Sequence, residues 1–392
     1  MKPIKKMKRG AATAIVMLSV LIGLVLFSIA FGQLFVDQVA QLLKDLPSVV
    51  DGVIAGAGSV VVFVPQIALL FLWIALLEGC GYLSRAAYLM DRLLVGLGLS
   101  GKSFIPLLSS FACAVPGIMA TRTISDPRDR LVTILIAPLM TCSARLPVYA
   151  MLIAAFIPDR QVGGLFNLQG LVLFALYMAG IVSAMVVALV LKRFMKQQSA
   201  QPLLMELPDY HVPHLRNLAL GLWERTAIFV KRVGTIILSL MIVLWFLSNF
   251  PAPPAGATGP AIEYSLAGML GRALEVVFAP IGFTWQICIA LVPGMAAREV
   301  AVAALGTVYA MSQTGDELSS ALVQLIGHAW SLPTALSLMT WYVFAPQCLS
   351  TVIVVKRETN GWRMPLVMLG YLFALAYGAS FVVYHGARAL GW

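Results

Sequence analysis

The amino-acid sequence predicts an all-α, polytopic helical membrane protein built from inverted repeats with broken or re-entrant helices. Of its 392 residues, 60% are hydrophobic and only 11% are charged, whereas soluble globular domains carry about 25% charged residues. Apolar runs of membrane-spanning length recur along the whole chain. Prolines and glycines interrupt two apolar stretches, and such interruptions are tolerated at membrane depth only where the backbone lines a cavity.

The charge balance and the cysteines exclude two other classes of protein. The formal net charge of +10 fits basic cytoplasmic loops facing anionic lipid, because the chain is so apolar, and nucleic-acid binding is not expected. The five cysteines are odd in number and lie in or beside apolar segments. A disulfide framework is therefore not expected either.

The chain opens with a lysine-rich segment followed by an apolar run over 13–30. This run is long for a secretory signal and ends in a poor cleavage site, so we interpret it as the first membrane helix, with the amino terminus held in the cytoplasm by its lysines. The full spans predicted from apolar runs are 12–34, 57–78, 131–157, 166–191, 233–250, 332–355 and 364–388.

Two further apolar stretches are too interrupted to be simple spans. One is 103–121, which contains Pro116, and the other is 285–310, which contains Pro293 and Gly294. We expect both to form discontinuous or re-entrant helices.

The segments between the spans predict the topology. The basic segment 192–232 and the turn at 356–358 are expected on the cytoplasmic side, because basic residues favour that side. The charge-poor segment 251–263 is expected outside, which leaves the carboxyl terminus outside as well.

Short sequence matches relate the two halves of the chain. VPGIMATR at 115–122 resembles VPGMAAR at 292–298. Downstream of each, an Ala-Pro pair precedes a cysteine, in APLMTC at 137–142 and in APQC at 345–348. The loop assignments make the two interrupted stretches enter the membrane from opposite sides, which is the inverted repeat of many secondary transporters.

Charged residues inside apolar segments are costly, so they mark functional sites by default. Glu78 ends the second predicted span, Arg145 lies in TCSARLPVY, and Arg298 and Glu299 lie in the middle of an interrupted stretch. The alternative for Glu78 is a solvated or paired charge at the membrane interface. Glu299 has apolar residues on both sides, and Arg298 is its candidate buried partner.

Three of the cysteines lie close to prolines, whereas Cys80 and Cys288 are interpreted as small apolar fillers. A broken helix frees backbone carbonyls, and a nearby thiol adds a polarizable ligand; together with a carboxylate, these suit a borderline metal ion such as Fe²⁺ rather than Mg²⁺ or Ca²⁺. The cysteines and their prolines are Cys113 with Pro116, Cys142 with Pro138 or Pro147, and Cys348 with Pro346.

The segment GLGLSGKS at 96–103 matches the phosphate-binding pattern G-x-x-x-x-G-K-[ST]. A P-loop needs a buried strand before it, and no βαβ pattern surrounds this segment, so no nucleotide site is predicted. We expect Gly101 to permit a tight turn and Ser103 to cap the broken helix that leads to Cys113. No metalloprotease zinc helix and no nucleophile elbow occurs in the sequence, so an enzyme is not expected.

Six motifs carry a resemblance to a known family. In chain order they read LLEGCGYLSRAAYLMDR, GLSGKSFIPLL, FACAVPGIMATRTI, DPRDRLVTILIAPLMTCSARLPVYA, WERTAIFVKRVGTIIL and VKRETNGW. The chain resembles the membrane portion of the ferrous-iron transport protein B family, FeoB, from about residue 51 to its end. That family joins a cytoplasmic GTP-binding domain to a membrane domain with two gate repeats, so the resemblance implies inverted gate-type repeats here.

The resemblance also implies roles for individual residues. Cys113, Cys142 and Cys348 match the motif cysteines proposed to line the iron path of the family. Glu78 matches the acid of its LLE motif, and Glu299 matches the acid that follows a basic residue in the second gate.

The chain departs from the family pattern at several positions. Ala114 stands where the family usually has an asparagine, Gly79 replaces an aspartate, and Arg298 replaces a lysine. The chain contains no N-K-x-D guanine-binding motif, so we expect the GTP-binding domain to be missing from it.

We therefore predict an inner-membrane, multi-pass transporter that takes up a divalent metal ion, Fe²⁺, through a path lined by the cysteines of both gate repeats. The predicted parts are a first membrane helix with an external amphipathic segment, a first gate repeat, a cytoplasmic linker and a second gate repeat, at 1–50, 51–191, 192–232 and 233–392. The expected structural or gating residues are Pro116, Pro138, Arg145, Pro293, Gly294, Arg298 and Pro346.

Two alternatives stay open: a gate-repeat carrier of an organic solute such as a nucleoside, and a non-transporting membrane partner of a separate GTPase. The expected partners are the metal ion and the lipid bilayer, with a separate GTPase subunit and a second copy of the chain as further candidates. No permanently bound cofactor is expected.

Overall fold

The computed structural model describes residues 101–162, 166–194, 215–231, 264–309 except 297 and 299, and 323–391 except 347, with scattered positions over 68–91 and 243–251. The chain divides into two compact units, the first made of Met1–Ser84 and Leu207–Ile242 and the second of Arg85–Glu206 and Val243–Trp392. The predicted first span lies outside the described residues, as do most of 57–78 and 233–250.

The described part of the first unit consists of helix α9 (Leu215–Phe229) and short helical pieces around Cys80. The Cys80 thiol donates a hydrogen bond to the carbonyl of Leu77 over 3.5 Å, which is a normal role for a small side chain that fills a helix end.

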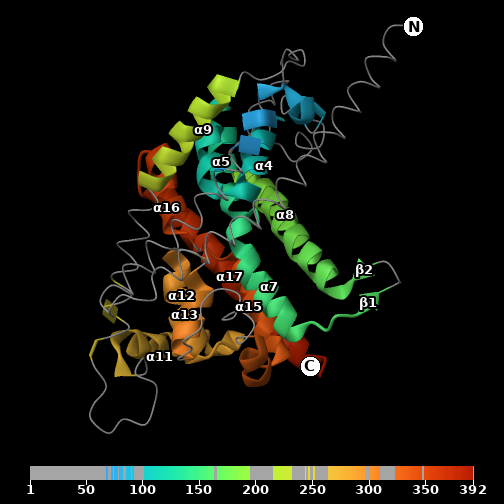
Figure 1. Cartoon of the computed structure of the whole chain (residues 1–392), viewed down its shortest axis with the longest axis vertical. Helices are drawn as coiled ribbons and strands as arrows, with labels where there is room; N and C mark the ends of the chain where they lie inside the picture. Colours follow the sequence, from blue (N-terminus) through green and yellow to red (C-terminus); the bar gives the residue numbers. More distant parts are fainter. Residues whose placement is uncertain are drawn as a thin grey trace. The chain divides into compact units, whose positions relative to one another are not determined.

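The second unit is helical and holds most of the described parts of the two predicted repeats (Figure 1). Its helices are α4 (Phe104–Ala112), α5 (Ala114–Ala120), α6 (Pro127–Ile136), α7 (Leu146–Phe156), α8 (Leu168–Phe194), α11 (Leu266–Phe278), α12 (Trp285–Ala296), α13 (Val300–Val308), α15 (Leu332–Phe344), α16 (Leu349–Glu358) and α17 (Arg363–Ala389). Short 3-10 turns, η1, η2, η3, η4 and η7, cover Gly101–Ser103, Thr121–Thr123, Ala137–Leu139, Ser143–Arg145 and Ala279–Ile281.

The predicted all-α class is confirmed. The strands found in the described ranges are the two-residue β1 (Gln161–Val162) and β2 (Phe166–Asn167), which pair antiparallel in the turn before α8. They close a connection between helices and contribute no sheet layer.

Two of the predicted spans are confirmed as continuous helices, α8 and α17. Each has 27 residues, or about 40 Å at 1.5 Å per residue, which exceeds the hydrocarbon thickness of a bilayer. Pro365 is tolerated in the first turn of α17, where its missing N–H has no intrahelical partner anyway. Within the described residues, three helical segments are long and apolar enough to span a membrane, or four if the bent pair α11 and α12 counts as one span.

Both interrupted stretches are broken helices, as predicted. The first breaks at Cys113 between α4 and α5, and the second breaks between α12 and α13 around Arg298. Pro293 and Gly294 were expected at the second break, but they lie inside α12.

The predicted span over 131–157 lies within a helical segment, Pro127–Phe156, that is long and apolar enough to cross a membrane, but neither it nor the predicted span over 332–355 is a continuous helix. The first is interrupted at 140–142, after the Ala-Pro pair that contains Pro138, and the second at 345–348, around Pro346. Hydropathy reports only the mean over a window, so a short extended stretch of apolar residues does not lower it. The apolar segment that contains the first break is 67% buried inside the protein, against 17% for α8, so its freed backbone groups face protein rather than lipid.

Helix α11 was not predicted. It joins α12 through η7 at a bend of 111°, and the bend is permitted by Gly282, which adopts φ +83. The side chain of Ser265 accepts a hydrogen bond from the N–H of Gly268 and so fixes the start of α11.

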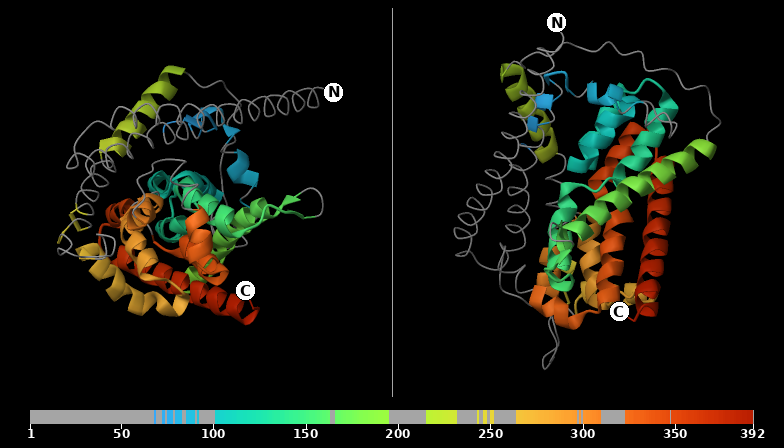
Figure 2. Two further views of the ribbon diagram at one scale, coloured as in Figure 1. Left: turned by 60° about the horizontal axis from the view of Figure 1, so that its bottom comes forward. Right: turned by 90° about the vertical axis from the view of Figure 1, so that its right-hand side faces the viewer.

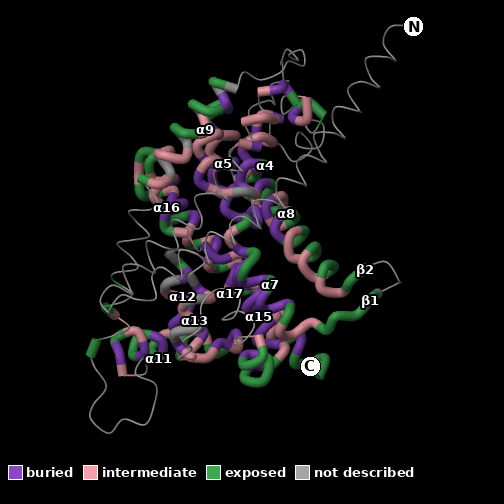
Figure 3. Tube along the Cα trace, in the orientation of Figure 1, coloured by how far each residue is buried: buried purple, intermediate pink, exposed green. Residues whose placement is uncertain are grey.

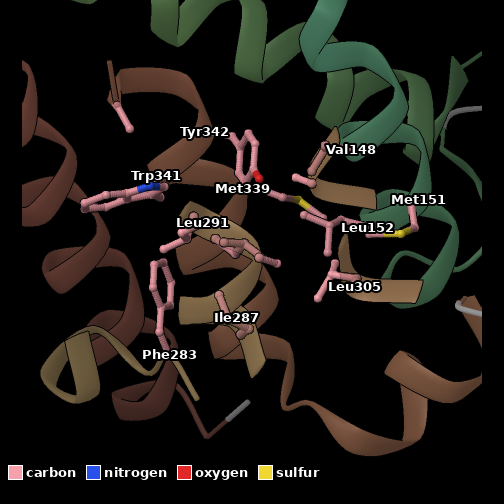
Figure 4. Close-up of a cluster of buried hydrophobic side chains, with 14 of the residues drawn as sticks. Val148, Met151, Leu152, Phe283, Ile287, Leu291, Leu305, Met339, Trp341 and Tyr342 are labelled. Carbon is pink, nitrogen blue, oxygen red and sulfur yellow. The ribbon is translucent and has the colours of Figure 1, made fainter. Parts of the chain in front are cut away.

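The core of the second unit joins helices from both predicted repeats. Buried side chains of α7 pack against those of α12, α13 and α15, with Trp341 and Tyr342 among the largest (Figure 4). The buried positions follow the centre of this helix group, while α8 and α17 carry exposed positions along their length (Figure 3).

Helices α15 and α17 run side by side (Figure 2). The Ser380 hydroxyl donates to the carbonyl of Ser337 over 3.0 Å, and the Ser337 hydroxyl donates to the carbonyl of Ile281 over 2.7 Å. Small hydroxyl residues let two membrane helices approach closely and bond directly.

Candidate functional site

All three motif cysteines stand at helix breaks, immediately before the next helical segment. Cys113 precedes α5, Cys142 precedes η4, and Cys348 precedes α16, each with extended backbone dihedrals. A residue that leaves helical geometry in this way ends the pattern of intrahelical hydrogen bonds, so carbonyl groups near it become free to bind other donors. The cysteines are partly or largely buried.

At the first Ala-Pro break, the free carbonyl is satisfied by a local arginine. Arg145 is fully buried, and its guanidinium donates to the carbonyl of Pro138 over 3.1 Å and to the hydroxyl of Thr141 over 3.3 Å. Both partners lie within seven residues of it in the sequence. Arg145 therefore stabilises the break by hydrogen bonds to the backbone and side chain beside it.

At the second Ala-Pro break, the free carbonyl is satisfied by a distant arginine. Arg298 comes from the break between α12 and α13, is 6% exposed, and donates to the carbonyl of Ala345 over 3.4 Å. The same guanidinium donates to the Sγ atom of Cys142 over 3.6 Å. One side chain thus joins the breaks that contain Cys142, Arg298 and Ala345.

The electrostatics of this region are dominated by the two buried arginines. Cys348 lies within electrostatic range of both Arg298 and Cys142, and the charges of Arg145 and Arg298 oppose one another. The hydroxyl of Tyr149 is buried close by and has no hydrogen-bond partner among the described residues. Among the described residues, the region therefore offers thiols, carbonyls and a phenol beside two buried guanidinium groups.

The predicted acids cannot be placed in this arrangement. Glu78 and Glu299 lie outside the described residues, so the pairing of Glu299 with Arg298 stays a prediction. Within the part of the chain that the structure describes, no group of three or more His, Cys, Asp or Glu side chains could hold a metal ion. The ligand set of three cysteines and an acid also stays a prediction.

The segment that resembles a P-loop has a structural role in the described residues. The N–H of Gly101 donates to the Asp91 carboxylate over 2.7 Å, and the ammonium group of Lys102 donates to the Ser125 hydroxyl over 3.2 Å. The expected capping role of Ser103 is wrong, because its side chain makes no cap hydrogen bond to α4.

The hydroxyl of Ser103 instead accepts a hydrogen bond from the Thr133 hydroxyl over 3.0 Å. Since Ser103 is buried against α6, its oxygen is used between segments rather than at a helix end. The turn therefore links the start of α4 to α6.

A cluster of ion pairs that sequence reasoning missed lies at the ends of α5 and α16. The Glu358 carboxylate accepts hydrogen bonds from Arg122 over 2.6 Å and from Arg130 over 2.7 Å. Hydrogen bonding to Glu358 raises the pKa of Arg122 above its ordinary value. The only sequence signal was the presence of Glu358 in VKRETNGW, one of the motifs of the resemblance.

This cluster shows that the match between VPGIMATR and VPGMAAR does not give its two arginines the same environment. Arg122 and Arg298 are aligned by the match, but Arg122 is exposed and paired with an acid, whereas Arg298 is buried beside a thiol. The Ala-Pro…Cys match corresponds more closely, because both copies coincide with a helix break.

Comparison with known proteins identifies the family. The family model Gate, described as nucleoside recognition, matches residues 60–156 and 230–362, more than half of the chain. Cys113 and Cys142 fall in the first matched segment and Cys348 in the second. A second model, described as the ferrous iron transport protein B C terminus, matches residues 173–225.

Several curated relatives carry the name Fe(2+) transporter FeoB. One from Leptospira interrogans is 44% identical over 349 residues, which cover 85% of this chain and 50% of the relative. One from Staphylococcus aureus is 40% identical over 88% of this chain and 49% of its own length. A fusion of Fe(2+) transport protein A with FeoB from Porphyromonas gingivalis is 38% identical over 87% of this chain and 44% of its own length.

The chain thus spans about half the length of the curated relatives it matches. No solved structure matches it significantly. The two segments matched by the Gate model contain the helix breaks at the motif cysteines. The chain belongs to the Gate family, and it is similar to about half the length of FeoB transporters.

Proposed function

We propose that this chain transports Fe²⁺ across the membrane through a path that passes the helix breaks of its two gate repeats. The observation that carries the proposal is that each of Cys113, Cys142 and Cys348 stands at a helix break with extended backbone. At two of these breaks a backbone carbonyl, that of Pro138 or Ala345, bonds to an arginine side chain. The printed names of the relatives support the choice of ion.

The chemistry of these donors suits a partly dehydrated divalent ion of borderline softness. Thiolate ligands favour Fe²⁺ and Zn²⁺ over Mg²⁺ and Ca²⁺, and carbonyl oxygens replace part of the hydration shell. A negative charge from Glu78 or Glu299 offsets the charge of the ion in this proposal. An inside-negative potential contributes about 4.6 kcal/mol per 100 mV to the inward movement of a divalent cation.

The proposal also includes the cellular setting of the chain. It places the protein in the inner membrane as a multi-pass protein, with its amino terminus in the cytoplasm. A GTPase that acts as a separate subunit is the partner proposed to couple nucleotide hydrolysis to the gate repeats, and a second copy of the chain is a further candidate partner.

Uptake into proteoliposomes tests this proposal. The purified chain is reconstituted and exposed to anaerobic Fe²⁺, Mn²⁺, Zn²⁺ and a radiolabelled nucleoside under an inside-negative potential. We expect Fe²⁺ uptake that falls at least about tenfold in Cys142→Ser and Cys113→Ser, because a hydroxyl is a poor replacement for a thiolate toward a borderline metal.

Cys288→Ser is the matched control, because Cys288 is a buried cysteine inside the continuous helix α12 rather than at a helix break. It should retain uptake of the wild-type order once its folding has been verified. Metal uptake that neither Cys113→Ser nor Cys142→Ser reduces would contradict the cysteine path. Uptake of the nucleoside without any metal would overturn the choice of substrate.

A further inference from the structure

Arg298 occupies donor groups that the proposed path would offer to its ion. Its guanidinium donates to the Sγ atom of Cys142 and to the carbonyl of Ala345. These acceptors belong to the equivalent Ala-Pro…Cys breaks of the two repeats. A soft sulfur and a backbone carbonyl are the types of ligand expected for the metal, and here both are bound by a protein cation.

The guanidinium and a divalent ion would compete for the same two acceptors, the Cys142 sulfur and the Ala345 carbonyl. Arg298 is 6% exposed and Arg145 is fully buried, so water screens neither charge well. A cation that entered the same donor groups would meet the guanidinium at contact distance, where repulsion in a poorly screened interior amounts to several kcal/mol. Arg145 is bound to Pro138 and Thr141, whereas Arg298 is the arginine that bonds directly to a motif cysteine.

We propose that Arg298 is a tethered cation that holds the ion-binding donors in the absence of the ion, and that its guanidinium must leave Cys142 and the Ala345 carbonyl before a divalent ion can bind them. Arg298 is then a specificity-determining residue, because it admits only an ion that binds these donors more strongly than a guanidinium does. The inference rests on the proposed function and deepens it.

The position of Arg298 in the chain permits such a movement. It lies in the gap between α12 and α13, and a residue in a helix break can change its backbone dihedrals without disturbing a continuous helix. The carbonyl contact of Arg298 at 3.4 Å is long compared with the 2.6 Å and 2.7 Å contacts of the Glu358 cluster. The guanidinium bonds to a sulfur atom and to a backbone carbonyl at these two breaks.

A metal-binding titration of the purified full chain tests the inference. Cd²⁺ is the probe, because its bond to a thiolate gives an ultraviolet charge-transfer band that reports binding directly. Arg298→Gln removes the charge, and we expect it to lower the half-saturating Cd²⁺ concentration by about tenfold. Arg298→Lys keeps the charge and is the matched control, with a half-saturating concentration within about threefold of the wild type.

Cys142→Ser in the Arg298→Gln background should abolish the gain, which assigns it to this sulfur. If Arg298→Gln does not fold, as judged by gel filtration and thermal unfolding, Arg298→Met makes the same charge change and keeps most of the apolar stem. Equal Cd²⁺ titrations for the wild type and the neutral variants would overturn the inference, and so would equal gains in Arg298→Lys and Arg298→Gln.

The titration measures binding and not transport, so the two proposals can fail separately. A chain that binds Cd²⁺ as expected but moves no Fe²⁺ in liposomes would refute the proposed function alone. A chain that transports Fe²⁺ with unchanged Cd²⁺ binding in Arg298→Gln would refute the role of Arg298 alone.

Discussion

At the scale of single residues, Gly101 shows how closely the segment before α4 packs. Its N–H is bound to the Asp91 carboxylate, and a Cβ atom added here would lie 2.5 Å from that carboxylate and 3.0 Å from the carbonyl of Ala87. The glycine of the P-loop pattern is therefore required for protein packing. A phosphate ligand plays no part in that explanation.

Gly101→Ala is expected to destabilise the protein by about 1–3 kcal/mol, since overpacking forces the neighbouring backbone to shift. The measurement is the midpoint of thermal unfolding in detergent. Gly378→Ala is the control, because a Cβ atom at Gly378 would meet nothing within 4 Å and alanine favours a helix interior. A Gly101→Ala variant as stable as the control would contradict this account of the packing.

For the buried arginines, the sequence predicted their burial but not the residues that they contact. The cost of a charge in an apolar segment singled out Arg145 and Arg298 correctly as buried residues. The contact between Arg298 and Cys142 spans 156 positions, and no local pattern encodes a contact between such distant positions. The expectation that Arg298 pairs with Glu299 rested on adjacency in sequence alone.

At the scale of elements, the breaks divide into those that proline patterns predicted and those that they did not. Proline fits the first turn of a helix, where no N–H is needed, and Pro147 in α7 and Pro333 in α15 have this position. A proline therefore marks a helix start as often as an interruption. This is why the breaks at 140–142 and 345–348 were hidden inside predicted spans, although the repeated Ala-Pro…Cys pattern marked both.

The Glu358 cluster is the element-scale contact with the clearest energetic consequence. The carboxylate is 4% exposed and serves Arg130, which is 33% exposed, and Arg122, which is 63% exposed. Removing the shared carboxylate leaves both arginines without this hydrogen-bond acceptor, whereas removing the more exposed arginine costs little folding stability. We expect Glu358→Gln to destabilise the protein by about 1–3 kcal/mol, Arg130→Ala by less, and Arg122→Ala least.

Thermal unfolding of the three variants in detergent gives this order directly. Asp159→Asn is the control, since the Asp159 carboxylate makes an exposed hydrogen bond to Asn167 away from the cluster. If Arg122→Ala were as damaging as Glu358→Gln, the burial of the shared carboxylate would not be the source of the stability.

At the scale of the whole molecule, α17 makes a prediction about topology. The basic turn before it contains Lys356 and Arg357, and basic residues favour the cytoplasmic side. The 27 residues of α17 then carry the chain across the bilayer. The two ends of α17 are therefore expected in different compartments.

Cysteine substitution tests this expectation in intact cells with a membrane-impermeant maleimide. Leu390→Cys should react from outside, and Gly361→Cys should react only after the membrane is permeabilised. The unsubstituted chain measures background labelling of its native cysteines. Labelling of Gly361→Cys in intact cells without labelling of Leu390→Cys would reverse the orientation proposed for the protein.

The ion pair between Arg122 and Glu358 has a consequence for how a signal could cross half of the bilayer. Helix α5 with η2 covers the ten residues 114–123 and starts after Cys113, while α16 covers ten residues and starts after Cys348. Ten helical residues extend about 15 Å, half the hydrocarbon thickness. The two helices pack together, so each works as a short rod with a thiol at one end and a charge at the other. Because Glu358 and Cys348 stand at opposite ends of α16, we expect a soluble protein that displaced Glu358 to shift Cys348 while it stayed entirely in water.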